Sequence, residues 1–180
     1  MACGKTTLGR AVAQAGVADF LDLDEIITAR SGLSPAQWFE KHGEKAFRDF
    51  EILSLRHVID SFASSDRQLI VACGGGTPAN GGAMDMMLSN GTVVWLEASL
   101  GRTIDRLLDA PGQRPIVDGM DRQKLLQFIP AHLASRVEFY RKAHARFDSS
   151  FLDSETEIAA SVAQFVSQFL SDDSSLTENN

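Results

Sequence analysis

A short polar segment near the amino terminus has the residue types that bind a polyphosphate. Gly4-Lys5-Thr6-Thr7 matches the second half of the motif G-x-x-x-x-G-K-[ST], and a sequence compatible with a helix follows it. In that motif, backbone N–H groups at the helix N-terminus face the phosphates, the lysine places a charge between the β- and γ-phosphates, and the hydroxyl coordinates Mg²⁺. A chance tetrapeptide on a flexible terminus is the alternative, so other residues must decide.

Two carboxylates follow at positions i and i+2 in Phe20-Leu21-Asp22-Leu23-Asp24, at the end of a strand candidate. In extended geometry two such side chains lie on the same side. One could hold Mg²⁺ through water, while the other accepts a hydrogen bond from a nucleophilic alcohol. Asp24 could instead cap a helix that begins at Glu25. The two roles are compatible.

Arg48 has a glutamate on either side at helical spacing, Glu44 before it and Glu51 after it. On a helix all three side chains meet. One interpretation is a solvated ladder of ion pairs worth about 0.2–0.5 kcal/mol each, and the segment taken alone favours it. The other is that Glu51 directs the Arg48 guanidinium toward a substrate carboxylate, in a bidentate geometry that lysine does not reproduce.

Three consecutive glycines, Gly74-Gly75-Gly76, directly follow the apolar run Leu69 to Cys73. Such a run costs conformational entropy unless the backbone must approach something closely. The carboxyl end of a parallel strand is where open α/β sheets bind ligands, so the glycines predict a ligand contact. An unusual but purely structural turn is the alternative.

Two more arginines could reach an anionic ligand. Arg114 lies in an aperiodic stretch rich in Asp, Gly, Pro and Arg, over residues 109–122, which indicates a lid that closes over a nucleotide. Arg136 stands one helical turn from Tyr140 and could supply a second cation to the substrate. A lone surface arginine is the default alternative there.

These residues need a scaffold, and the pattern of the chain indicates one. Apolar runs at Ala18 to Leu23, Leu69 to Cys73 and Thr92 to Leu96 alternate with stretches of helical period, which predicts a parallel sheet in an α/β layer fold. The second run is apolar at every position and is therefore expected to be a central strand with helices on both faces. Pro130 is expected to break or kink a helix over 121–143.

Composition restricts the classes of function. The chain has 180 residues and a formal charge of −7, which predicts one domain over 1–171 and argues against nucleic acid as a partner. No apolar run approaches the roughly 18–20 residues of a membrane helix. We expect a soluble, cytoplasmic monomer with Cys3 and Cys73 as structural thiols, and a disordered polar tail over 172–180.

Taken in order and at these separations, the residues resemble the shikimate kinase family, P-loop kinases of the nucleoside-monophosphate-kinase-like group. The resemblance covers Met1 to about Phe147. It implies a three-layer α/β/α fold with a central parallel sheet, and transfer of the ATP γ-phosphoryl group to the 3-hydroxyl of shikimate, a step towards chorismate. The motifs are Phe20-x-Asp22-x-Asp24, Gly43-Glu44-x-x-Phe47-Arg48-x-x-Glu51, Gly74-Gly75-Gly76, Arg114-Pro115 and Arg136-x-x-x-Tyr140.

The resemblance also implies a role for each matching residue. Asp22 would meet Mg²⁺ through water together with Thr6, and Asp24 would bind the reacting hydroxyl. Arg48 and Arg136 would clamp the shikimate carboxylate, and Gly74, Gly75 and Gly76 would contact the ring. Catalysis would rest on Lys5, Asp24 and the lid residue Arg114, and Arg106 is the best candidate for an arginine that packs on adenine. The implied nucleotide-binding residues are Ala2, Cys3, Gly4, Lys5, Thr6, Thr7, Arg106 and Arg114.

The start of the chain departs from the family pattern. The first glycine of the phosphate motif would fall two residues before Met1, and the strand that should feed the loop is missing. We expect a fuller protein to begin roughly ten residues earlier, and the chain as given to have weak or no activity and low stability. The alternatives are an impaired shikimate- or nucleotide-binding module and a related kinase such as a gluconate kinase.

Overall fold

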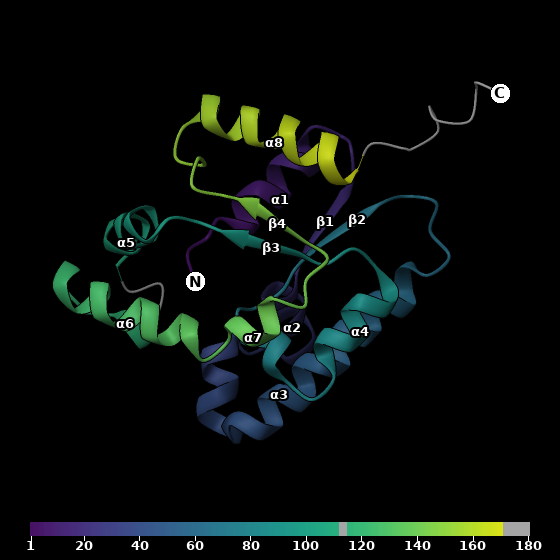
Figure 1. The fold of residues 1–180 in the computed structure, drawn as a ribbon. Helices are drawn as coiled ribbons and strands as arrows, with labels where there is room; N and C mark the ends of the chain where they lie inside the picture. The colour runs from purple at the N-terminus through teal and green to yellow at the C-terminus, as the bar shows by residue number, and fades with distance from the viewer. Residues whose placement is uncertain (112–114, 171–180) are drawn as a thin grey trace.

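The structure, a computed structural model, describes residues 1–111 and 115–170. The predicted lid residue Arg114 and the predicted tail 172–180 lie outside the described residues. Within them, no helix is long and apolar enough to cross a membrane. In chain order (Figure 1) the elements are α1 (Lys5–Gln14), β1 (Asp19–Asp22), α2 (Leu23–Ser31), α3 (Pro35–Phe62), β2 (Leu69–Ala72), η1 (Thr77–Ala79), α4 (Ala83–Asn90), β3 (Val94–Glu97), α5 (Leu100–Asp109), η2 (Pro115–Val117), α6 (Arg122–Ala134), α7 (Val137–Tyr140), β4 (Ala145–Asp148) and α8 (Glu155–Phe169).

The strands form two parallel pairs. β1 pairs with β2, from Asp19 opposite Leu69 to Asp22 opposite Ala72, and β3 pairs with β4 over Val94 to Glu97. The three strands expected from the apolar runs are confirmed. Within the described residues, β2 and β3 do not pair with each other, so the strands form two separate two-stranded sheets. Consequently Leu69, Ile70 and Val71 are only partly buried, although their apolar run is typical of a central strand.

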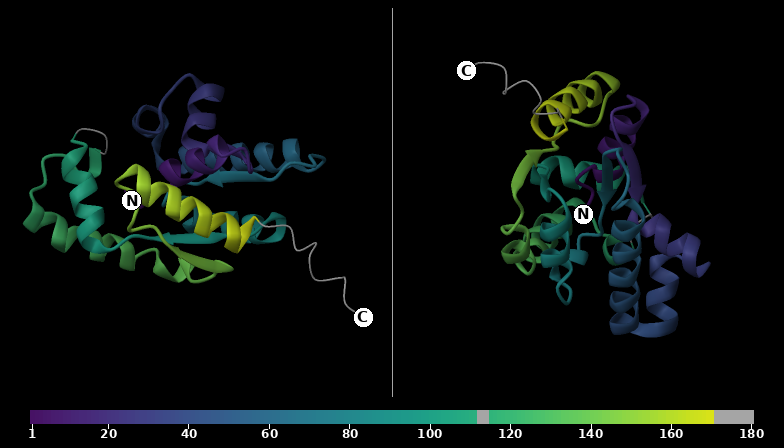
Figure 2. Two further views of the ribbon diagram at one scale, coloured as in Figure 1. Left: turned by 90° about the horizontal axis from the view of Figure 1, so that it is seen from above. Right: turned by 90° about the vertical axis from the view of Figure 1, so that its right-hand side faces the viewer.

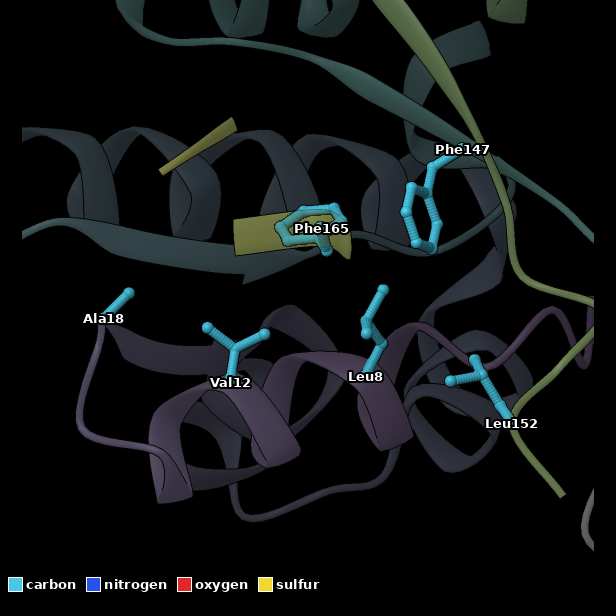
Figure 3. Packing of buried hydrophobic residues seen from close by; sticks show 6 residues of the cluster. All are labelled: Leu8, Val12, Ala18, Phe147, Leu152 and Phe165. Atoms are coloured by element: carbon cyan, nitrogen blue, oxygen red, sulfur yellow. The ribbon is translucent and has the colours of Figure 1, made fainter. Parts of the chain in front are cut away.

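Helices cover both faces of the strands, as the prediction of an α/β layer fold requires. Figure 1 shows α1 and α8 on one face and α2, α3 and α4 on the other. The first face is closed by a cluster in which Leu8 and Val12 of α1 meet Phe165 of α8 and Phe147 of β4 (Figure 3). Leu23 and Ile27 of α2, with Leu55 of α3, form the core of the second face. The strands' carboxyl ends are therefore held between two packed layers.

Helix α3 consists of two helical segments joined at Gly43. Its start is fixed by Ser34, whose hydroxyl accepts from the Gln37 N–H while the Gln37 side chain accepts from the Ser34 N–H. Gly43 has φ 80° and ψ 169°, a conformation that residues with a Cβ rarely adopt. The segment after the glycine carries Arg48 and Glu51 toward the strands.

The helix around Pro130 differs from the prediction. Pro130 lies inside α6, which runs from Arg122 to Ala134, and α7 begins at Val137. The chain breaks after the proline rather than at it, because a proline ring removes one donor and crowds the preceding turn without preventing the next turns. The break places Arg136 at the N-cap of α7, next to the site.

Candidate active site

The phosphate-binding segment lies at the carboxyl ends of the strands. Gly4, with φ 80°, is the N-cap of α1, and a Cβ at this position would lie 2.4 Å from the Leu152 Cδ1 atom. The first turn of α1 has no acidic residue, and its cap has no side chain to accept from the leading N–H groups. These N–H groups and the helix dipole form an environment that suits an anion. The predicted polyphosphate contact therefore fits the local structure.

Lys5 and Cys3 lie side by side in this segment. The Lys5 Nζ atom is 3.7 Å from the Cys3 Sγ atom. Burial raises the pKa of the Cys3 thiol, but the positive charge of Lys5 counts against it, and the net shift of the pKa is downward. Ala2 has a φ of 48°, in the left-handed region. The loop before α1 thus combines an unusual backbone with a cationic side chain.

The two aspartates at the end of β1 differ from the expectation in which of them caps the helix. Asp22 is the N-cap of α2, since its carboxylate accepts from the Asp24 N–H at 3.0 Å. The interpretation of Asp24 as a helix cap is therefore wrong: the helix begins at Leu23, because Asp22 makes the cap two residues earlier. Asp24 lies in the first turn of α2 and not in extended geometry with Asp22.

The residues predicted to hold Mg²⁺ are in contact with each other. The Thr6 hydroxyl donates to the Asp22 Oδ2 atom at 2.7 Å. A hydroxyl and one carboxylate are oxygen ligands of the kind that Mg²⁺ takes from a protein when phosphates and waters supply the rest. The pair fits the ion. Within the described residues, no cluster of three or more acidic, His or Cys side chains could hold a metal by itself.

Arg48 and Glu51 form a buried pair and not a solvated ladder. The Glu51 side chain is 2% exposed and accepts from Arg48 Nη1 at 2.9 Å, whereas Glu44 is 69% exposed and 3.8 Å from Arg48 Nε. The rings of Phe47 and Phe39 also lie within 5.2 Å and 6.0 Å of the Arg48 Cζ atom. Because the Glu51 carboxylate is buried and accepts from Arg48, the fold itself fixes the orientation of the Arg48 guanidinium.

Glu51 also binds two residues that the sequence reasoning missed. Thr77 donates to Glu51 Oε1 at 2.7 Å and Asn80 donates to Glu51 Oε2 at 3.1 Å. Asn80 donates as well to the carbonyl of Gly76, at 3.1 Å. The signal that could have found them is the run of Thr, Pro, Ala and Asn directly after the glycines. Helical spacing relates residues of one helix, so it could not connect this run with Glu51 of α3. Together these bonds fix the carboxylate that orients Arg48.

The triple-glycine turn, residues 74–76, lies against several predicted side chains at once. A Cβ on Gly76 would be 2.6 Å from Arg48 Nη2, and one on Gly75 would be 3.5 Å from Arg136 Nη1. A Cβ on Gly74 would be 3.8 Å from the Asp24 Oδ1 atom. At Gly76 a Cβ would force the Arg48 guanidinium to move, whereas the distances given for Gly75 and Gly74 are ordinary van der Waals contacts.

Tyr140 fastens the same turn from the side of α7. Its hydroxyl donates to the carbonyl of Gly75. Burial raises the pKa of this hydroxyl, so that it remains a donor. The Trp95 ring of β3 packs on it at 5.5 Å between centroids. Arg136 and Tyr140 thus approach the turn together.

A cavity of about 1080 Å³ connects the phosphate side with the substrate side. Lys5, Gly74, Gly75 and Arg136 line it. Cys73 lies in its wall, and burial raises the pKa of that thiol to about 12, which keeps it neutral. Residues from three separate stretches of the chain, around Lys5, Gly74 and Arg136, therefore meet in this cavity.

Arg106 holds the start of the chain against the loop after β4. Its guanidinium donates to Asp153 Oδ1 at 2.6 Å, to the carbonyls of Ser149 and Ser150 at 3.1 Å, and to the carbonyl of Ala2 at 3.4 Å. These bonds lie in the plane of the guanidinium, so its face is the part that could meet a base. The predicted packing on adenine stays a prediction.

A helix N-terminus with a lysine, a hydroxyl and carboxylate pair, and a cavity lined by Lys5 and Arg136 are typical of a P-loop kinase of small molecules. The shikimate kinase family model matches residues 1–168. The shikimate kinase of Bacteroides fragilis is 34% identical over 164 residues, 91% of this chain and 89% of that one, and that of Gloeobacter violaceus is 36% identical over 84% and 81% of the two chains.

Solved structures agree. The structure of shikimate kinase from Bacteroides thetaiotaomicron has a TM-score of 0.84 and 32% identity over 93% of both chains. Shikimate kinase from Acinetobacter baumannii in complex with shikimate has a TM-score of 0.73 and 26% identity, over 93% of this chain and 88% of that one. The chain belongs to the shikimate kinase family.

Proposed function

We propose that this protein transfers the γ-phosphoryl group of ATP to the 3-hydroxyl of shikimate. The observation that carries the proposal is the convergence of Arg48 and Arg136 on the triple-glycine turn, with Asp24 on the same turn. The structure of the Acinetobacter baumannii relative in complex with shikimate supports the choice of substrate. A small carboxylic acid with a neighbouring hydroxyl matches two cations and one carboxylate so arranged.

The substrate side holds the acid through guanidinium groups. The guanidinium of Arg48, oriented by Glu51, donates two hydrogen bonds to the carboxylate of the substrate. Arg136 approaches from the other side of the turn. The backbone of Gly75 is held in place by Tyr140 and contacts the ring of the substrate. Because these groups are fixed before binding, little ordering entropy is lost when the acid binds.

The phosphoryl side supplies charge and position. The leading N–H groups of α1 and the Lys5 ammonium hold the polyphosphate, and Asp24 accepts a hydrogen bond from the reacting hydroxyl and takes its proton. Thr6 and Asp22 would hold Mg²⁺, which when bound neutralises charge on the β- and γ-phosphates. Arg106 meets the base. Such positioning provides most of the catalysis in phosphoryl transfer.

The decisive experiment measures ADP formation with ATP, Mg²⁺ and shikimate, with gluconate as the matched control acid. Turnover that depends on shikimate and not on gluconate supports the proposal. Shikimate binding by calorimetry without any turnover would instead support a binding module, the second candidate function. No binding of shikimate at all would contradict both.

Asp24→Asn is the variant that isolates the chemical step. We expect kcat to fall about 10²–10³-fold with little change in shikimate affinity, because the amide does not accept the proton. Glu25→Gln, one residue away, is the matched control, since Glu25 is paired with Arg10 on the surface. A turnover number near that of the unmodified protein would exclude Asp24 as the partner of the hydroxyl.

We further propose that the protein works as a monomer in the cytosol. Cys3 and Cys73, the cysteines of the chain, are both free thiols, which suits a reducing compartment. Sedimentation at working concentrations, with and without both substrates, tests the monomer. A dimer that forms only with substrates would contradict it.

A further inference from the structure

The hydroxyl of Tyr140 joins two groups of the substrate side. It donates to the carbonyl of Gly75, and the Arg136 side chain donates to it in turn. A Cβ on Gly75 would lie 3.2 Å from the Tyr140 oxygen and 3.5 Å from Arg136 Nη1, so the three groups share one corner of the turn. The position of this single oxygen therefore affects both a guanidinium and a backbone carbonyl.

The helix that carries Tyr140 does not hold the ring in place by itself. α7 has four residues, Val137–Tyr140, and none of them is buried. Its N-cap makes no side-chain hydrogen bond to the leading N–H groups. A helix of one turn is not stable in isolation, because so few hydrogen bonds do not offset the cost of nucleation. Contacts from outside α7 must therefore position the Tyr140 ring.

One such contact comes from Trp95 of β3. Its ring lies 5.5 Å from the Tyr140 ring between centroids, with 50° between the planes, a tilted geometry that aromatic pairs favour. Val94 and Leu96 pack against the apolar cluster of α1 and α8. Because successive side chains of a strand point to opposite faces, Trp95 points to the other face, toward Tyr140. Of the four residues of β3, Trp95 is the one that brings a ring to the substrate side.

Arg146 of β4 holds the Trp95 ring from the neighbouring strand. The two residues are opposite each other in the parallel register, so their side chains lie on the same face of the sheet. The Arg146 Cζ atom is 4.6 Å from the centre of the Trp95 ring, within the range of a cation–π contact. Glu97, two residues after Trp95, is 3.7 Å from the Arg146 guanidinium. Both strands of the pair therefore fix the indole ring.

The β4 strand lies at an edge. Within the described residues it pairs only with β3, and both views of Figure 2 show it, in light green, at the margin of the molecule. The Arg146 side chain is 58% exposed, so it can be replaced without opening the core. The contacts thus run from the surface of the molecule through Arg146 and Trp95 to Tyr140.

We infer that Trp95 is a positioning residue of the substrate site: its ring fixes the Tyr140 hydroxyl, and Arg146 fixes the ring. Through that hydroxyl, Trp95 sets the place of the Arg136 guanidinium and of the Gly75 carbonyl. The assignment of these groups to shikimate rests on the proposed function, whereas the placement of the hydroxyl does not depend on the substrate. Trp95 acts on the acid only through Tyr140.

A test without substrate is possible because Tyr140 is the only tyrosine of the chain. Protein isotope-labelled at the tyrosine Cζ atom gives one NMR signal, whose pH titration reports the pKa of this hydroxyl. Burial raises that pKa, and Arg136 opposes the rise. In Trp95→Leu we expect the pKa to fall toward the usual value of about 10, because the ring becomes accessible to water, whereas Trp95→Phe should keep it raised. An unchanged pKa in Trp95→Leu would overturn the inference.

The test with substrate measures shikimate affinity by calorimetry. Trp95→Leu should weaken shikimate binding about 5-fold and leave ATP affinity unchanged, and Trp95→Phe should restore binding to within about 2-fold. Tyr140→Phe lacks the hydroxyl, so in that background Trp95→Leu should change shikimate affinity by less than about 2-fold. Equal weakening in both backgrounds would show that Trp95 does not act through Tyr140, which also overturns the inference.

Arg146→Met tests the same contacts at an exposed position, and it applies even if Trp95→Leu does not fold. We expect shikimate affinity to fall about 3-fold and the pKa of Tyr140 to fall as well, whereas Arg146→Lys should keep most of the affinity. Arg67→Met replaces another exposed arginine, paired with Asp19, and should change neither value. If neither value changed in Arg146→Met, the inference would be overturned.

The two readouts separate this inference from the proposed function. If the unmodified protein bound no shikimate while the pKa of Tyr140 fell in Trp95→Leu, the proposed function would fail and the positioning of the hydroxyl would stand. Shikimate binding by the unmodified protein, with no effect of Trp95→Leu on affinity or on the pKa, would refute the positioning role alone.

Discussion

The two halves of the cavity differ in how firmly their charged groups are held. On the substrate side, Arg48, Glu51 and Asn80 form a buried network that spans α3 and the loop after β2. On the phosphate side, Lys5 has a contact of 3.7 Å with the Cys3 sulfur, and the loop before α1 borders the open space between the two strand pairs. The charge of Arg48 is thus held by a buried network from two elements, whereas the charge of Lys5 lies next to a residue of its own segment. Substitutions on the two sides should separate these properties.

The strongest test of the contrast is Glu51→Ala. Its removal leaves Arg48 without its buried counter-ion and Thr77 without an acceptor, so we expect a loss of about 3 kcal/mol in the free energy of unfolding. Urea unfolding measures it. Glu44→Ala, on the exposed side of the same arginine, is the control and should change stability by less than about 0.5 kcal/mol. Similar losses in the two variants would show that the buried network is no firmer than the surface pair.

Arg48→Lys addresses binding alone. The lysine ammonium is a point charge and does not reproduce the two parallel hydrogen bonds of a guanidinium. We therefore expect shikimate affinity to fall about 10–100-fold while ATP affinity is kept. Calorimetry with each substrate measures both values. Lys45→Arg changes an exposed residue of the same helix, paired with Asp49, and should leave both affinities unchanged. Unaltered shikimate affinity in Arg48→Lys would refute the clamp.

Tyr140→Phe removes one hydrogen bond from the triple-glycine turn. Because the bond to the Gly75 carbonyl is worth about 1 kcal/mol, we expect shikimate affinity to fall about 5-fold. Fluorescence of Trp95, which packs on the Tyr140 ring, offers a direct titration. Loss of ATP affinity to the same extent would show that the two halves are not independent.

The smallest effect concerns the two thiols. Since the pKa of Cys3 is lowered and that of Cys73 is raised to about 12, alkylation by iodoacetamide should begin at Cys3 below the usual pH range of a free cysteine, while Cys73 stays unmodified up to about pH 10. Mass spectrometry of peptides after labelling at several pH values measures this. Lys5→Met should move the Cys3 profile upward, because the ammonium lowers the pKa. An unmoved profile would contradict that cause.

Features that depend on a single continuous segment of the chain could be predicted from the sequence. The apolar run Leu69 to Cys73 predicted a strand, and β2 runs from Leu69 to Ala72 with the three glycines directly after it, whereas the ligand contact of these glycines stays a prediction. The spacing of Arg136 and Tyr140 indicated that they stand one helical turn apart, and both lie next to Gly75. Local patterns specify such features, because the interacting atoms belong to neighbouring residues.

Features that join distant elements could not be predicted. Spacing alone favoured a solvated ladder around Arg48, since burial of Glu51 depends on Thr77 and Asn80 from another element. The cap of α2 lies at Asp22 and not at Asp24, because the helix begins two residues earlier than the sequence pattern indicated. Which strands pair with each other depends on the topology of the whole fold. Hydrophobic periodicity does not contain this information, so the separation of the strands into two pairs could not be predicted from it.

Gly43 has one more consequence. By reversing direction there, α3 brings the Trp38 ring onto Phe50, with 5.1 Å between centroids and 12° between planes, and Phe39 onto Phe47 at 5.5 Å. The guanidinium of Arg48 therefore lies beside two aromatic rings of its own helix, those of Phe39 and Phe47. Because Glu51, which orients it, is also bonded to Thr77 and Asn80, this arrangement requires both α3 and the segment after the triple-glycine turn, and an exchange of the proposed acid-binding residues would have to include both.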